Sequence, residues 1–132
     1  MAVGTAVDWR ERLDAGDMSS ESLVLTAFDR IRQLDPHLHA ILAMDEARSL
    51  QVARAADARL LAGERSPVLG LPIVLKDNLN WTGLPVSCGS RVLDGYRAPY
   101  DATVVGRLLQ AGAVPLAKAN MDEFAMGSSG EY

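Results

Sequence analysis

The chain has 132 residues, of which 48% are hydrophobic and 23% are charged. This composition is typical of a folded globular protein and excludes a disordered one. The net charge is -4, with 8 basic against 11 acidic residues in positions 1–70 and 5 against 6 afterwards. Because neither half is basic, direct binding to a nucleic-acid backbone is not expected. No stretch reaches the roughly 18 apolar residues of a membrane span.

The N-terminal segment shows no positively charged stretch followed by an apolar one, so a secretory signal is not expected. The chain has a single cysteine, Cys88, which cannot form an internal disulfide. Absence of disulfides is typical of a reducing compartment. The expected location is therefore the cytoplasm.

The first 63 residues predict mainly helices. A short helix is expected over residues 6–14, and Gly16 ends it. Ser19 is expected to cap a second helix that runs to about Leu34, with apolar residues recurring at the helical period, and Pro36 is expected to stop it.

A strand and a third helix complete this N-terminal part. The mostly apolar run at residues 38–43 favours a short strand. Asp45 is then expected to cap a helix rich in alanine and arginine that runs to about Leu61. Gly63 stands where a glycine commonly ends a helix.

After Gly63 the pattern changes to strand, loop, helix and strand. The continuous aliphatic run at residues 71–75 is typical of a strand that is covered on both faces. Residues 77–100 predict a long loop, which in a compact domain is usually functional. Asp101 is expected to cap a helix that Gly112 closes, followed by a second buried strand at residues 113–117. The inner face of that helix is predicted to hold Val104, Val105, Leu108 and Ala111.

This order predicts an α/β fold. A strand, a crossover helix and a second strand favour a right-handed unit with parallel strands. We therefore expect helices packed on a partial, mainly parallel sheet. The chain is interpreted as a single domain, 1–132, in which 1–63 form a helical part and 64–132 begin the α/β core.

Two lysines follow the two aliphatic strands directly, Lys76 and Lys118. Lysine is seldom fully buried, and the carboxyl ends of strands are where α/β proteins build their sites. Each lysine could simply extend its ammonium group to solvent, which is the interpretation favoured for Lys118. For Lys76 the following Asp77 and Asn78 could orient the amine, so composition leaves a surface lysine and a buried base both open.

Other candidate groups carry weaker signals. His37 and His39 lie close together, but no third ligand has matching spacing, so ordinary polar roles are favoured over a metal site. Cys88 has no paired histidine in its half of the chain and is interpreted as a small buried residue rather than a nucleophile. The segment 127–130 is a small polar loop by composition.

Four blocks of sequence resemble the amidase signature family. They are residues 70–78, 99–105, 109–114 and 118–129, and their order and spacing fit the family together. Residues 19–43 resemble the family's N-terminal helices and first strand. The resemblance implies the N-terminal part of the amidase signature fold. Within the family, the block at 118–129 is most similar to the A subunit, the amidase component, of tRNA-dependent amidotransferases.

The resemblance also implies a mechanism of amide hydrolysis. Family members use a serine nucleophile, a second serine whose peptide bond is cis, and a lysine, to which Lys76 corresponds. Lys76 is expected to accept a proton from the bridging serine and to return it to the leaving amine. Such a lysine must be largely neutral, a state that burial favours. Gly127, Ser128 and Ser129 correspond to a loop near the substrate pocket and are expected to present hydroxyl or backbone groups to the amide.

For the amidotransferase branch, the resemblance implies partners. Glutamine is the small-molecule substrate, and its ammonia passes to a B subunit that uses ATP to activate misacylated Glu-tRNA(Gln) or Asp-tRNA(Asn). The B and C subunits would complete a heterotrimer, and the tRNA is contacted mainly through the partner. No cofactor and no metal are expected in the glutamine-hydrolysing component itself.

The family's serine-rich segment with both catalytic serines lies downstream of residues 118–129. The chain is therefore expected to be an N-terminal fragment that is inactive alone. Two alternatives stay open. One is a fragment of another amidase signature hydrolase acting on a small amide, a urea-derived compound or a peptide C-terminal amide, and the other is a noncatalytic interaction module. The sequence does not distinguish the amide substrate or the acceptor tRNA.

Overall fold

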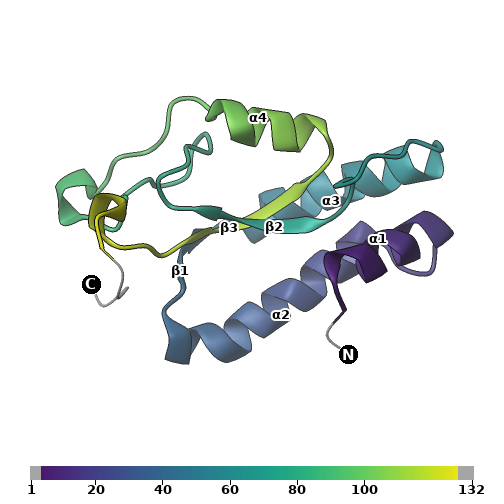
Figure 1. Cartoon of the computed structure of the whole chain (residues 1–132), viewed down its shortest axis with the longest axis horizontal. Coiled ribbons are helices and arrows are strands. Elements are labelled where there is room, and N and C mark those ends of the chain that lie inside the picture. The colour runs from purple at the N-terminus through teal and green to yellow at the C-terminus, as the bar shows by residue number, and fades with distance from the viewer. Residues whose placement is uncertain (1–3, 128–132) are drawn as a thin grey trace.

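The computed structural model describes residues 4–127 of the chain. Helices lie on both sides of a small central sheet (Figure 1). The elements, in chain order, are α1 (Ala6–Ala15), α2 (Ser20–Leu38), β1 (Ile41–Met44), α3 (Glu46–Leu61), β2 (Pro72–Lys76), the 3-10 helix η1 (Arg91–Leu93), α4 (Thr103–Gln110), β3 (Val114–Ala119) and the 3-10 helix η2 (Glu123–Ala125).

Side chains that the sequence marks as caps begin α2 and α3. Ser19 accepts a hydrogen bond from the Ser22 N–H at 3.1 Å, and Asp45 accepts one from the Arg48 N–H at 3.0 Å. Both predicted caps are confirmed. They are predictable because a cap depends only on neighbouring residues, where a side-chain oxygen replaces a missing backbone acceptor.

Two predicted boundaries are wrong. Pro36 does not stop α2, which continues through it to Leu38 and ends with His39 in a left-handed conformation. Proline removes one backbone hydrogen bond, but this last turn is exposed, so water can replace the lost donor. Asp101 does not cap α4, whose N-cap is Ala102. The Asp101 carboxylate instead accepts hydrogen bonds from the backbone and hydroxyl of Thr82, each at 2.7 Å.

The sheet has three strands in the order β1-β3-β2. β2 and β3 pair in parallel, as predicted for the strands on either side of α4. β1, predicted at 38–43 and observed at Ile41–Met44, pairs antiparallel with β3. The α/β class is therefore confirmed, and the sheet contains one parallel and one antiparallel pair.

Two hydrophobic clusters cover the two faces of the sheet. The first joins α2 and α3 to β3 and draws on both the 1–63 and the 64–132 parts; its buried members are Val24, Phe28, Ala53, Ala56, Leu69, Val114, Leu116 and Ala117. The second lies under α4 and contains Leu75, Trp81, Leu84 and Val105. Of the inner face predicted for α4, Val105 is fully buried, but Val104 is 46% exposed, so its assignment is wrong.

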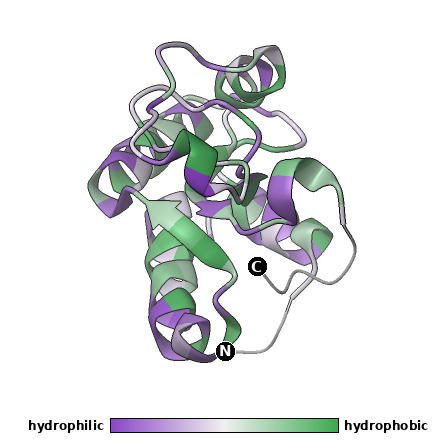
Figure 2. Cartoon of the chain, turned by 90° about the vertical axis from the view of Figure 1, so that its left-hand side faces the viewer, coloured by the Kyte–Doolittle hydropathy of each residue, from purple (hydrophilic) through white to green (hydrophobic). Residues whose placement is uncertain are grey.

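Viewed from the end that carries the loops, the helices show both hydrophobic and hydrophilic stretches, as expected for helices covered on one face (Figure 2). Within residues 4–127, no helix combines the length and the apolar character that crossing a membrane requires.

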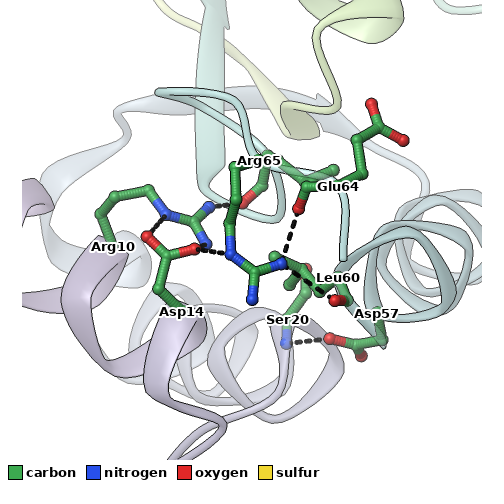
Figure 3. A network of polar contacts seen from close by, with 8 residues as sticks. Arg10, Asp14, Ser20, Asp57, Leu60, Glu64 and Arg65 are labelled. Carbon is green, nitrogen blue, oxygen red and sulfur yellow. Dashed lines mark hydrogen bonds and ion pairs between the residues drawn. The ribbon is translucent and has the colours of Figure 1, made fainter. Parts of the chain in front are cut away.

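A polar network holds the N-terminal helices to the segment before β2 (Figure 3). Asp57 of α3 accepts hydrogen bonds from the backbone N–H groups of Ser20 at 2.6 Å and Glu21 at 3.0 Å, so it caps α2 from outside. Asp14 of α1 pairs with Arg10 at 2.8 Å and with Arg65 at 3.0 Å. The hydrogen bond from Arg10 is the main cause that lowers the pKa of Asp14.

Candidate functional site

The carboxyl ends of β2 and β3 meet at one edge of the sheet because these strands are parallel. In their register Leu75 lies beside Lys118, and Lys76 lies beside Ala119. Neighbours across a ladder share a face, and successive residues alternate between faces. The two lysines therefore stand at the same end of the sheet, as predicted, but on opposite faces.

Lys118 is fully buried, so the prediction that it extends its charge to solvent is wrong. Its ammonium group donates to the Asp77 carboxylate at 3.1 Å, to the Asp77 carbonyl at 3.2 Å and to the Pro85 carbonyl at 3.2 Å. The loop that follows β2 supplies all three acceptors and covers the amine. An ammonium group has three N–H donors, so this set satisfies it completely.

Asp77 is the counterion of Lys118, and only 1% of it is exposed. One carboxylate oxygen pairs with Lys118, and the other accepts from the Ser87 backbone N–H at 2.8 Å and the Ser87 hydroxyl at 2.7 Å. The Asp77 N–H donates to the Ala119 carbonyl at 3.0 Å. The sequence suggested that Asp77 orients its neighbour Lys76, but its carboxylate pairs with the other lysine.

Lys76 is exposed in the described part of the chain. It ends β2 on the sheet face that also carries Val74, which is 46% exposed. The expected burial of Lys76 is therefore not observed, because residues 4–127 place no layer over this end of that face. Its Nζ has no hydrogen-bond or ion-pair partner among these residues. The catalytic role of Lys76 stays a prediction.

The loops that follow β2 and β3 pack against each other beside the buried pair. Phe124 donates its N–H to the Cys88 carbonyl at 2.9 Å, and the Ser90 hydroxyl donates to the Glu123 carboxylate. Gly89 lies so close that a Cβ atom there would stand 2.5 Å from the Met121 carbonyl oxygen. These contacts connect the loop that carries Asp77 to the segment after β3.

The predicted substrate loop is described only at its start. Gly127 is exposed and follows η2 closely. Ser128 and Ser129 lie outside the described residues, so their contact with the substrate amide stays a prediction.

Cys88 is partly exposed rather than buried as expected, and it has a left-handed backbone with φ 53°. Burial and then the nearby Asp77 carboxylate raise the pKa of its thiol, and Lys118 offsets part of this rise. A raised pKa keeps the thiol protonated at neutral pH, which does not favour a cysteine nucleophile.

The two histidines lie away from this edge of the sheet, at the end of α2. His39 caps that helix, and its carbonyl accepts a hydrogen bond from the Asn120 side chain at 3.0 Å. Within residues 4–127, no group of three or more His, Cys, Asp or Glu side chains is placed to hold a metal ion.

The sequence suggested Lys76 as the candidate but did not identify the Lys118–Asp77 pair. A signal for the pair exists in the sequence. Parallel pairing of the two aliphatic runs places Lys118 beside Leu75, two residues before an aspartate. What the sequence does not contain is the path of the loop after β2, which turns back over the sheet end and removes Lys118 from water.

The family model "Amidase" matches residues 22–132. The chain is 50% identical to the A subunit of the glutamyl-tRNA(Gln) amidotransferase of Halorhodospira halophila over 127 residues, which cover 96% of this chain and 26% of that protein. It is 49% identical to the protein of the same name from Acidothermus cellulolyticus, covering 96% of this chain and 25% of the relative. The chain thus spans about a quarter of the length of these relatives.

Solved structures give the same result. The peptide amidase of Stenotrophomonas maltophilia superposes with a TM-score of 0.86 and 37% identity, covering 93% of this chain and 26% of that one. An amidase family protein from Bacillus anthracis superposes with a TM-score of 0.83 and 31% identity, covering 91% and 24% of the two chains. By the family match and the shared fold, the chain belongs to the amidase signature family.

Proposed function

We propose that this chain forms the N-terminal part of the glutamine-hydrolysing A subunit of a tRNA-dependent amidotransferase. The observation that carries the proposal is the identity of about half to relatives with that name along nearly the whole chain. Glutamine would be hydrolysed at this component, and the ammonia would be used to convert Glu-tRNA(Gln) or Asp-tRNA(Asn) to its amidated form. The complex would work in the cytoplasm.

Lys76 would act as the proton acceptor in the hydrolysis. It would take a proton from a bridging serine as the nucleophilic serine attacks the amide carbon, and return that proton to the departing ammonia. Both serines would come from the part of the family fold beyond the length that this chain spans. Support for this role comes from the exposed position of Lys76 beside Val74, on a sheet face that further residues could cover.

Covering that face would supply the condition that a lysine base requires. A lysine shielded from water loses its proton more readily than one in solvent. Lys118 does not suit this role because its three donors are already used by Asp77 and Pro85. Gly127, Ser128 and Ser129 would contribute groups that bind the amide.

The partners follow from the same proposal. A B subunit would bind ATP and the acylated tRNA, and a C subunit would complete the heterotrimer. Neither a cofactor nor a metal is required in the glutamine-hydrolysing component. The isolated chain of residues 1–132 is expected to release no ammonia from glutamine.

A chimeric enzyme tests the proposal. Residues 1–132 would replace the matching quarter of the Halorhodospira halophila A subunit, and the chimera would be produced with the other components of that enzyme. We expect release of ammonia from glutamine and amidation of Glu-tRNA(Gln). Lys76→Ala should lower the rate by about 10²- to 10⁴-fold, the usual contribution of a general base.

Arg107→Ala is the matched control, because Arg107 is an exposed cation on α4, away from the strand ends. Its activity should equal that of the parent chimera. An inactive chimera that is folded and assembled, or a Lys76→Ala variant that keeps full activity, would refute the proposal.

A hydrolase of another amide within the same family is the alternative, favoured by the 37% identity to a peptide amidase. Assays of the complete protein on glutamine and on a peptide C-terminal amide separate the two functions. Turnover of the peptide amide with no turnover of glutamine would favour the alternative.

A further inference from the structure

The buried Lys118–Asp77 pair stands immediately beside the residue assigned as the base, and its geometry restrains the backbone there. Lys118 donates to the Asp77 carbonyl as well as to the carboxylate, and the Asp77 N–H donates to the Ala119 carbonyl. Three hydrogen bonds therefore fix the residue that follows Lys76.

The backbone of Lys76 is restrained from its own side as well. Its carbonyl accepts a hydrogen bond from the Leu79 N–H at 2.9 Å, which closes a turn directly after β2. The preceding residue, Leu75, is buried under α4 and only 2% exposed. With both flanks held, the direction in which the Lys76 side chain leaves the strand is set before any substrate binds.

The same pair is linked to the segment that follows β3. The second oxygen of the Asp77 carboxylate holds Ser87, and the next residue, Cys88, accepts the Phe124 N–H. A chain of contacts thus runs from Lys118 through Asp77 and Ser87 to η2, a few residues before Gly127. A displacement of the Asp77 carboxylate would be transmitted to both sides of the site.

We propose that Asp77 and Lys118 are positioning residues that hold the end of β2, and with it Lys76, in the orientation needed for proton transfer. This inference rests on the proposed function of Lys76. The pair touches neither the substrate nor the reacting atoms. It acts through the backbone and through Ser87, in a reaction where small errors in placement lower the rate strongly.

A positioning role and a purely structural role give different results when both charges are removed together. Deleting one partner leaves the other charge buried and unpaired, which destabilises the fold strongly, whereas replacing both by neutral groups of similar volume is often tolerated. Stability should therefore recover in a double variant. The anchor on the Asp77 carbonyl is still missing there, so the rate of hydrolysis should not recover.

The test uses Asp77→Asn, Lys118→Met and the double variant in the complete chimeric complex. Thermal unfolding should occur at lower temperature in each single variant and return close to the parent value in the double variant. The kcat for glutamine hydrolysis should be lower by on the order of tenfold to a hundredfold in all three, with KM for glutamine little changed. Recovery of kcat together with stability in the double variant would overturn the inference.

A milder pair of variants decides the question if the charge variants do not fold. Ser87→Ala removes the hydroxyl that donates to Asp77 at 2.7 Å but keeps the backbone donor at 2.8 Å. We expect a severalfold loss of kcat at unchanged KM. Ser49→Ala is the matched control, because the buried Ser49 hydroxyl donates to the Pro115 carbonyl at 2.7 Å, away from this sheet end.

Equal kcat values for Ser87→Ala and Ser49→Ala would overturn the positioning role. An inactive parent chimera would instead refute the proposed function, and the inference would fall with it. Activity in the parent with unchanged rates in every variant would refute the inference alone.

Discussion

Gly89 provides a direct test of how closely the loops after β2 and β3 pack. Its backbone has φ 68°, in the left-handed region, and an added Cβ atom would lie 2.5 Å from the Met121 carbonyl oxygen. Gly95 in the same loop region has φ 79°, with no atom within 4 Å of an added Cβ. Alanine at either position has the same backbone conflict, and only at Gly89 does it also meet another backbone segment.

The expected losses of stability follow from these two terms. Alanine in the left-handed region costs about 1–2 kcal/mol, which should be the whole effect of Gly95→Ala. At Gly89 the contact is with backbone, so no side chain can rotate away and the loops must separate. Forced overpacking costs about 1–3 kcal/mol more. Separation also weakens the hydrogen bond between Phe124 and Cys88, worth about 1 kcal/mol.

We therefore expect Gly89→Ala to lower the free energy of unfolding by about 2–3 kcal/mol more than Gly95→Ala does. Urea denaturation followed by circular dichroism measures both values. Gly95→Asn is a further control, because asparagine tolerates the left-handed region better than alanine and should cost less. Equal losses in the two alanine variants would refute the packing of these loops.

Three further predictions concern other groups. Asp57→Ala should lower the free energy of unfolding by about 1–2 kcal/mol, because it removes the acceptor for two backbone N–H groups that begin α2, whereas Glu11→Ala on exposed α1 should change it little. Alkylation of Cys88 by iodoacetamide should reach half its maximal rate at a higher pH than alkylation of a cysteine in a short peptide, because burial raises the pKa of this thiol. Hydrogen bonds from the backbone and side chain of Thr5 lower the pKa of Asp8, so its stabilising effect is present above about pH 4 and is lost as the pH falls through the folded-state pKa; the difference in urea midpoint between Asp8→Asn and the parent should shrink accordingly.

The parts of the fold that local chemistry determines could be predicted from the sequence. The caps Ser19 and Asp45 and the two aliphatic strands depend on residues close together in the chain, and they lie where the pattern indicates. Asp101 shows where such reasoning fails. An aspartate just before a helix usually caps it, but here Thr82, 19 residues earlier, binds the carboxylate instead. A tertiary partner replaced the local one, and the sequence pattern does not contain that partner.

The assignment of burial to the two lysines failed for a related reason. Each follows an aliphatic strand, and the local patterns differ little, so composition could not decide which one meets water. The outcome depends on the loop of residues 77–90, which brings the Asp77 and Pro85 oxygens over Lys118 and leaves Lys76 on the other face. A buried charge is tolerated where partners satisfy it, and only the folded loop shows where those partners are.

This arrangement reverses what burial alone would suggest about function. The fully buried lysine has all three of its donors in use already, and it cannot exchange a proton without disrupting the pair. The exposed lysine keeps an unshared amine at the sheet end where the family places its chemistry. A base needs an accessible nitrogen first and shielding second, and shielding can be added by residues that pack over Val74 and Lys76. In this chain, the buried lysine fixes the geometry, and the exposed lysine is the one free to transfer a proton.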